Sequence, residues 1–305
     1  MTPIADTAPD DPEHGSASSG AVDLHYEARG RGPAVLLVTG FGMTVASWWR
    51  TVPVLARHFR VIALDNRGVG RSGGSRWPYF VGRMADDAVA VLDSAGEERA
   101  HVYGISLGGM VAQEIALRHP ERVRALVLGA TTAGGAGAPR GDLGALSFFS
   151  RARTMQEEEA HWAAVPYMYG ERTRRRRADR IGQDIERRLE PEAPSLTTHV
   201  QQLTAAGSHR TEHRLDEIAA PTLVVHGADD VLLPVENGRT LAAGIPDAEL
   251  RVWPGAGHFY PTDEPRADRD VARFLRVHTS EHPAPSRLLA RARRVAASLG
   301  GARDR

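Results

Sequence analysis

The sequence contains no cysteine and no lysine, and each absence excludes a set of chemistries. Without cysteine the chain can form no disulfide, use no thiolate nucleophile and bind no zinc through sulfur. The 38 residues of the combined Lys and Arg count are all Arg, which excludes a lysine Schiff base and the lysine of a phosphate-binding P-loop. Any nucleophile must therefore come from another residue type.

The sequence also lacks a net charge and a long apolar run. Lys and Arg number 38, as do Asp and Glu, whereas nucleic-acid-binding domains usually carry a basic surplus. No segment approaches the roughly 18 apolar residues of a membrane-spanning helix. Residues 1–20 are rich in Pro, Asp, Ser and Gly and lack the basic start and apolar core of a signal peptide. We predict a cytoplasmic protein with no nucleic-acid partner and no membrane contact, and leave homodimer formation open.

The order of apolar runs and helical patterns indicates an α/β fold. Runs with little alternation, typical of strands buried on both faces, occupy residues 34–38, 60–64, 101–105, 125–128, 222–225 and 249–253. Patterns of helical period lie between them, at residues 83–95, 107–119, 235–244 and 265–275. This alternation predicts a doubly wound, mostly parallel sheet.

One long segment breaks the alternation. Residues 133–215 open with a Gly-rich turn and continue with helical patterns and no apolar strand, which predicts a helical cap inserted between two strands. The core then comprises residues 21–132 and 216–276. Residues 1–20 are expected to be a disordered tail. Residues 277–305 form a basic tail, either a frayed solvated helix or an amphipathic helix that contacts a partner.

The predicted cap contains a cluster of arginines, comprising Arg172, residues 174–177 and Arg180. Charge runs usually form a solvated face, and the acidic residues nearby would balance this one. The alternative is an entrance that attracts anionic substrates.

The pentapeptide Gly104-Ile105-Ser106-Leu107-Gly108 matches G-x-S-x-G, the sharp strand-to-helix turn that presents a nucleophilic serine. It directly follows an apolar strand and leads into a helical pattern. Side chains two positions before or after the serine would collide with neighbouring backbone, so glycine is expected there. We predict that Ser106 is the nucleophile.

A serine hydroxyl needs a base, and the base needs a carboxylate to orient it. His258 follows a Gly-Ala-Gly turn directly after the last predicted strand, where it can reach Ser106. The loop that follows His226 offers both Asp229 and Asp230. We favour Asp230 on loop spacing, keep Asp229 as the alternative, and interpret His226 as structural.

Hydrolysis of an acyl group also needs two N–H donors for the developing oxyanion. The N–H of Leu107, the residue after the nucleophile, is the first. The second is expected from the Gly-rich loop at residues 39–43, where the N–H of Phe41 fits best because Gly40 lets the backbone approach closely.

Taken together, these motifs resemble the α/β-hydrolase superfamily over roughly residues 21–276. Gly-Ile-Ser-Leu-Gly-Gly-Met, Asp-Asn-Arg-Gly-Val-Gly-Arg-Ser at residues 65–72, Pro-Thr-Leu-Val-Val-His-Gly-Ala-Asp-Asp and Gly-Ala-Gly-His occur in the superfamily's order. Within it the chain is similar to the lactonase, esterase and cofactor-free haloperoxidase group. The resemblance favours Asp230 over Asp229, and it implies that residues 65–72 form a structural turn. Many relatives have His where this chain has Thr39, which implies altered substrate contacts.

From these residues we predict a serine hydrolase that cleaves a carboxylic ester or lactone of a small molecule through an acyl-enzyme. The alternative is a lyase, cyclase or perhydrolase reaction on the same residues. We expect no cofactor and no metal. Substrate contacts are expected from Trp48, Trp162 and Tyr167. Further candidates are aromatic or apolar cap residues, namely Phe148, Phe149, Met168 and Tyr169.

A competing zinc motif, H-x-x-E-H, runs from His209 to His213. Two histidines four residues apart on one helix face could bind zinc. The sequence offers them no obvious third ligand, so we give this interpretation little weight.

Overall fold

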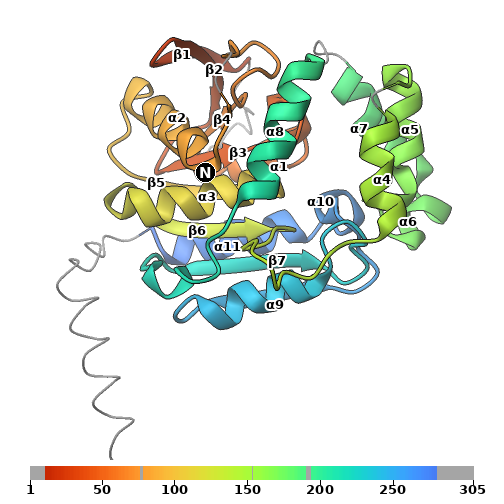
Figure 1. Cartoon of the computed structure of the whole chain (residues 1–305). Helices are drawn as coiled ribbons and strands as arrows, with labels where there is room; N and C mark the ends of the chain where they lie inside the picture. The colour runs from red at the N-terminus through yellow and green to blue at the C-terminus, as the bar shows by residue number, and fades with distance from the viewer. Residues whose placement is uncertain (1–10, 76–77, 153, 190–193, 280–305) are drawn as a thin grey trace, which may run out of the picture.

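One sheet forms the centre of the protein (Figure 1). The computed structural model describes residues 11–75, 78–152, 154–189 and 194–279, and within them eight strands pair in the order β1-β2-β4-β3-β5-β6-β7-β8. The pairs β1·β2 and β2·β4 are antiparallel and the others parallel. The strands are β1 (Glu13–Ser19), β2 (Val22–Arg29), β3 (Ala34–Val38), β4 (Arg60–Leu64), β5 (Ala100–Ile105), β6 (Val123–Gly129), β7 (Thr222–Gly227) and β8 (Glu249–Trp253). The predicted α/β fold and its six apolar strands are confirmed.

Helices cover both faces of the sheet, which is why its strands are continuous apolar runs. In β3, Leu36 and Val38 pack into one core and Val35 and Leu37 into the other. The first core is completed by α2 (Val81–Ser94), α3 (Leu107–Arg118) and α9 (Val235–Gly244). The second is completed by α1 (Thr51–Leu55), α10 (Tyr260–Asp263) and α11 (Ala267–Val277). The predicted helices at 83–95, 107–119, 235–244 and 265–275 correspond to α2, α3, α9 and α11.

The predicted N-terminal tail is wrong for part of its length. Residues Glu13–Ser19 form β1, which pairs with β2 across a turn at Gly20, where φ is +65°. Only Ala17 and Ser19 of β1 are buried, because it is an edge strand with one face in solvent. It therefore has no apolar run that would reveal it. Residues 1–10, and residues 280–305 of the predicted basic tail, lie outside the described part of the chain.

Helices without an intervening strand occupy the described residues between β6 and β7, the segment that contains the predicted cap. They are α4 (Leu143–Ala152), α5 (Glu157–Met168), α6 (Glu171–Arg176), α7 (Ala178–Leu189) and α8 (Leu196–Ser208). Figure 1 shows α4–α7 (green) grouped at one side of the molecule, with α8 between them and the sheet. In the part of the chain that the structure describes, each helix is too short or too polar to cross a bilayer.

A buried carboxylate attaches the cap to the core. Asp184 of α7, 2% exposed, accepts hydrogen bonds from Trp49 Nε1 at 3.1 Å, Arg50 Nε at 2.9 Å and Thr262 Oγ1 at 2.5 Å. These three donors come from segments more than 70 residues away on either side. Because the carboxylate is paired with Arg50 and hydrogen-bonded, its burial is compensated.

A second buried carboxylate is less well compensated and predicts a pH effect on stability. Asp268 of α11 is buried, and one of its oxygens accepts from Thr51 Oγ1 at 3.0 Å. Burial raises its pKa to about 6, against 3.8 ordinarily, and the Thr51 hydrogen bond opposes the rise only in part. Between these two values the folded state keeps a proton that the unfolded chain releases. Stability therefore falls as the pH rises through this window, by about 3 kcal/mol in total.

We expect Asp268→Asn to raise the thermal midpoint at pH 7 by roughly 5 °C, because it removes the buried charge. The gain should vanish below about pH 3, where Asp268 is protonated in both states. Circular dichroism melts at the two pH values measure this. An equal difference at both would mean that the charge of Asp268 is not responsible.

Candidate active site

Ser106 lies at the turn between β5 and α3, in a conformation that non-glycine residues rarely adopt. Its φ is 57° and its ψ is −121°. A Cβ at Gly104 would overlap the carbonyl oxygen of Gly108, and a Cβ at Gly108 would overlap that of Val38. The backbone is held by a 2.9 Å hydrogen bond from Ser106 N–H to the Gly129 carbonyl. The turn has the conformation that the G-x-S-x-G motif predicts.

Ser106 and His258 line the same cavity, which has a volume of about 90 Å³. His258 is 2% exposed, and its Nδ1 lies 2.8 Å from Oδ2 of Asp230. Because Asp230 engages Nδ1, Nε2 is the nitrogen left to accept a proton from the serine. The structure thus brings together the three predicted residues, which come from three separate loops.

The environment of Asp230 keeps it ionised. Its Oδ1 accepts the N–H groups of Leu232 and Leu233, each at 2.9 Å, and His226 Nε2 lies 3.4 Å from its Oδ2. Burial alone would raise the pKa of Asp230. The charge of His258 and hydrogen bonds from His226 and His258 outweigh burial and hold the pKa well below its usual value. The carboxylate can therefore fix the tautomer of His258 at any working pH.

Asp229 and His226, the alternatives for the acid and the base, make other contacts. Asp229 is exposed, and its N–H donates to the Ala256 carbonyl. His226 is fully buried, with Nε2 2.7 Å from the Leu233 carbonyl, so it stabilises the loop of Asp230. These contacts agree with the structural interpretation of His226.

Backbone groups suited to an oxyanion adjoin Ser106. Ser106 is the N-cap of α3, so Leu107 provides the first N–H of that helix, at the end where the helix dipole favours negative charge. On the other side, a Cβ at Gly40 would lie 3.5 Å from the Cβ of Ser106, so the loop carrying Phe41 passes close to Ser106. Phe41 also lines the cavity.

Two side chains anchor that loop. Asn66 Nδ2 donates to the carbonyl and to Oγ1 of Thr39, both at 3.0 Å. Gly42 N–H donates to Oε1 of Gln202, on cap helix α8, at 2.9 Å. Thr39 is therefore tied to the core, and the cap itself contributes to fixing the loop.

Residues 65–72 form a structural turn, as the family resemblance implied. Asp65 accepts Val45 N–H at 2.8 Å and Arg71 N–H at 3.0 Å, and Ser72 Oγ donates to the Asp65 carbonyl at 2.6 Å. None of these residues lines the cavity that contains Ser106.

The loop that carries His258 is bound directly to the cap. One oxygen of Asp263 accepts the N–H of Gly257 at 2.7 Å and that of Gly170, in the cap, at 2.9 Å. Phe259 N–H donates to the carbonyl of Met168, the last residue of α5, at 2.8 Å. Phe259 is thus held directly by the end of α5, and Gly257 is held to the adjacent Gly170 through Asp263.

The predicted substrate contacts are only partly in place. Trp48 is buried and lines the cavity. Trp162 is 47% exposed and lines neither this cavity nor an adjoining one of about 300 Å³ under the cap, so its prediction is corrected. Tyr167 also lines neither cavity and packs on Phe148, with ring centroids 5.4 Å apart. On α5 the turn of the helix directs Met168, rather than these two residues, toward the site.

The other candidates differ among themselves. Phe148 and Tyr169 line the adjoining cavity, and Met168 lines both cavities. The side chain of Phe149 lies outside the described part of the structure.

Sequence reasoning missed Arg188 of α7, which lines both cavities. Its side chain is 9% exposed, and the guanidinium carbon lies 3.9 Å from the ring centroid of Phe259. One nitrogen donates to Tyr169 OH at 3.1 Å, while Nε is buried with no hydrogen-bond partner among the described residues. Its Nη2 lies 3.9 Å from Oδ2 of Asp184, so the charge of the guanidinium is only partly offset. A guanidinium at a cavity wall is suited to a negatively charged ligand group.

The arginine cluster of the cap lies apart from the cavities. The side chains of Arg172, Arg174, Arg175 and Arg176 are exposed and line neither cavity, and Arg175 pairs with Glu171. These four side chains have the exposure of a solvated face, whereas Arg177 and Arg180 are half-buried and Arg180 Nε donates to the Thr262 carbonyl at 3.0 Å. In sequence nothing separates Arg188 from such residues.

The H-x-x-E-H motif does not form a site. His209 is 4% exposed and lies 3.3 Å from Thr211 Oγ1, whereas the side chain of His213 is 67% exposed. Neither belongs to a group of three or more potential metal ligands among the residues that the structure describes.

Comparison with known proteins agrees with this geometry. A family model described as the alpha/beta hydrolase fold matches residues 33–265. The chain is 33% identical over 254 residues to the proposed carbamate hydrolase RutD of Azorhizobium caulinodans, covering 82% of this chain and 93% of that protein. It is 34% identical to a 2-hydroxy-6-oxononadienedioate/2-hydroxy-6-oxononatrienedioate hydrolase of Paraburkholderia phymatum, covering 77% and 84%. A thermophilic esterase of Thermogutta terrifontis superposes with a TM-score of 0.75 at 26% identity, covering 89% of this chain and 100% of that chain.

Proposed function

Because the chain belongs to the α/β-hydrolase fold family, we propose that it is a serine hydrolase that cleaves a carboxylic ester or lactone of a small molecule. One observation supports this most strongly. Ser106, held at a φ of 57°, shares a cavity with His258, whose Nδ1 is fixed at 2.8 Å by a buried carboxylate. This is the arrangement that makes a serine hydroxyl nucleophilic.

In this proposal Ser106 Oγ attacks the carbonyl carbon while His258 Nε2 accepts its proton. The N–H groups of Phe41 and Leu107 stabilise the oxyanion. His258 then protonates the leaving oxygen, and the acyl group stays on Ser106. Water, deprotonated by His258, releases the acid. Carbamates and activated carbonyls would enter the same scheme, as the names of the relatives suggest.

We further propose that the substrate carries an anionic group that binds Arg188. The position of this guanidinium on the wall of both cavities, where it stacks on Phe259, supports the assignment. So does the name of one relative, a hydrolase of a dioate. The two adjoining cavities, of about 90 and 300 Å³, would divide the substrate between the reacting carbonyl and this anchor.

Arg188→Met should raise KM for an acidic ester by roughly 10- to 100-fold, because a hydrogen bond to a charged group is lost. The neutral counterpart should be affected much less. Monoethyl adipate compared with ethyl hexanoate, assayed by acid release, measures this. Arg187→Met, which removes a neighbouring exposed arginine of the same helix, is the matched control. Equal effects of Arg188→Met on the two esters would contradict the anionic anchor.

A substrate panel in water enriched in oxygen-18 tests the reaction itself. Esters and lactones should yield acids that contain one solvent oxygen. A fluorophosphonate should label Ser106, as located by mass spectrometry. Turnover of a panel member without solvent oxygen in the product would instead indicate a lyase or cyclase reaction.

A further inference from the structure

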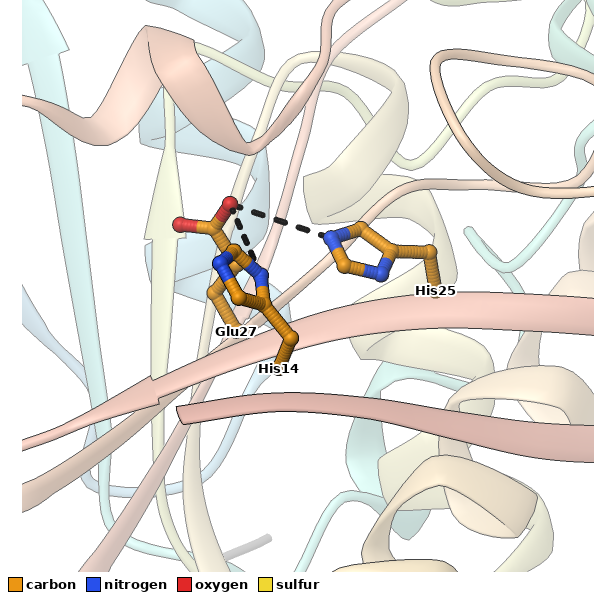
Figure 2. Close-up of side chains that lie close together, drawn as sticks. All are labelled: His14, His25 and Glu27. Atoms are coloured by element: carbon orange, nitrogen blue, oxygen red, sulfur yellow. Dashed lines mark ion pairs between the residues drawn. The ribbon is translucent and has the colours of Figure 1, made fainter. Parts of the chain in front are cut away.

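The hairpin of β1 and β2 places three potential metal-binding side chains together (Figure 2), and none of them lines the cavity of Ser106. His14 of β1 pairs directly with Glu27 of β2 in the antiparallel register. His25 lies two residues before Glu27, so the two side chains share a face of the strand. The strand pairing alone therefore brings these three side chains to one point.

Their donor atoms have the spacing of a metal site. Glu27 Oε1 lies 3.6 Å from His14 Nδ1 and 3.7 Å from His25 Nε2, and all three donor atoms lie within 4.8 Å of one another. A tetrahedral zinc ion with bonds of roughly 2.0–2.1 Å holds its ligand atoms about 3.4 Å apart. Small side-chain rotations would convert the present spacing into coordination.

His25 adds a second, independent observation. It is 9% exposed, and its Nε2 is buried without a hydrogen-bond partner among the described residues. Its backbone is fixed on both sides, since its N–H donates to Ser72 Oγ at 2.8 Å and its carbonyl accepts Asp65 N–H at 2.9 Å. This buried nitrogen lies 3.7 Å from the Glu27 carboxylate, which is too far for a hydrogen bond. A metal ion between the two groups would bind both.

We propose that His14, His25 and Glu27 bind one divalent transition-metal ion, with water as the fourth ligand. Two imidazole nitrogens and one carboxylate form a donor set that suits zinc. The ion would join β1 to β2 and stabilise the edge of the sheet. It takes no part in the reaction at Ser106.

The positively charged side chain of Arg71 would repel a bound metal ion, and this provides a test of the geometry. Its Nη1 lies 3.2 Å from His14 Nδ1, so metal binding must displace the guanidinium and overcome its charge. The backbone N–H of Arg71, which binds Asp65, does not depend on the side chain. Arg71→Met should therefore strengthen metal binding several-fold.

The experiment is a titration of the untagged, chelator-treated full chain with Co²⁺, followed by displacement with Zn²⁺. We expect one Co²⁺ per chain, with the visible absorption of a four-coordinate ion that Zn²⁺ abolishes. His25→Ala should weaken binding by roughly 100-fold or more, since loss even of an outer-shell partner costs 10- to 100-fold. Zn²⁺ should also raise the thermal midpoint of the wild type but not of this variant.

If His25→Ala fails to fold, Glu27→Gln provides the same test. His14→Ala is a further variant of this kind, and it replaces a half-exposed side chain. His213→Ala is the matched control, because it removes a histidine of the H-x-x-E-H motif and should leave binding unchanged. The proposal is overturned if the wild type binds no Co²⁺. It is equally overturned if the hairpin variants bind as the wild type does, or if His213→Ala alone abolishes binding.

Discussion

Replacing Ser106 by Ala is expected to lower kcat for p-nitrophenyl butyrate by roughly 10⁴- to 10⁶-fold, because no other group in the proposed scheme can form the acyl-enzyme. The fold should persist, since the Ser106 contacts with Gly129 and Thr131 are made by backbone atoms of the serine. Fluorophosphonate labelling should disappear together with turnover.

Ser106→Gly is the informative companion variant. It should be as inactive as Ser106→Ala but more stable, because glycine adopts a φ of 57° and a ψ of −121° without the strain that a Cβ imposes. The expected gain over Ala is about 1–3 kcal/mol in the free energy of unfolding. Esterase activity in Ser106→Ala equal to that of the wild type would exclude the mechanism for that substrate.

Replacing Asp230 by Asn is expected to lower kcat by roughly 10³- to 10⁴-fold with little change in KM. The amide can still accept Leu232 and Leu233 N–H through its oxygen. Its NH₂ group, however, would face Nδ1 of His258 and favour the tautomer in which Nε2 carries the proton. That histidine cannot accept a proton from serine.

Asp229→Asn is the matched control, because it makes the same chemical change one residue away at an exposed position. Its kcat should stay within about twofold of the wild type, since surface substitutions of this kind have small effects. Loss of activity in Asp229→Asn with retention in Asp230→Asn would reverse the assignment.

The acid side of the stability profile provides a separate readout for Asp230. Its pKa is depressed in the folded state, so its ionised form stabilises the protein above the ordinary aspartate pKa. That contribution is lost progressively as the pH falls below this value. Asp230→Asn should therefore show a smaller loss of stability on acidification than the wild type, as measured by thermal melts.

The features that the sequence predicts well are those governed by local rules. β3 and β5 are recognisable because strands buried on both faces must be continuously apolar. The turn at Ser106 is recognisable because Gly104 and Gly108 leave no room for a Cβ. These constraints act over a few residues, so a short stretch of sequence is enough to reveal them.

The features that were missed depend on contacts between distant segments. Arg188 differs from the solvated cap arginines because it stacks on Phe259, 71 residues along the chain, and donates to Tyr169 OH. β1 has no apolar run because it covers an edge of the sheet. Trp162 was assigned to the pocket by residue type, but the direction in which α5 packs decides that it is exposed.

The shared carboxylate of Asp263 has a consequence for how this protein could be re-engineered. Because one oxygen of this carboxylate accepts the N–H groups of both Gly257 and Gly170, it holds the loop of His258 to the cap. A Cβ at Gly170 would overlap the carbonyl oxygen of Gly255, so a transplanted cap would need a glycine at that point. In a chimaera that exchanges only the cap residues, these hydrogen bonds to the loop of His258 would be lost. We expect such a chimaera to lose turnover rather than to change specificity. A successful exchange must carry the Gly170 turn and α10 across as one piece.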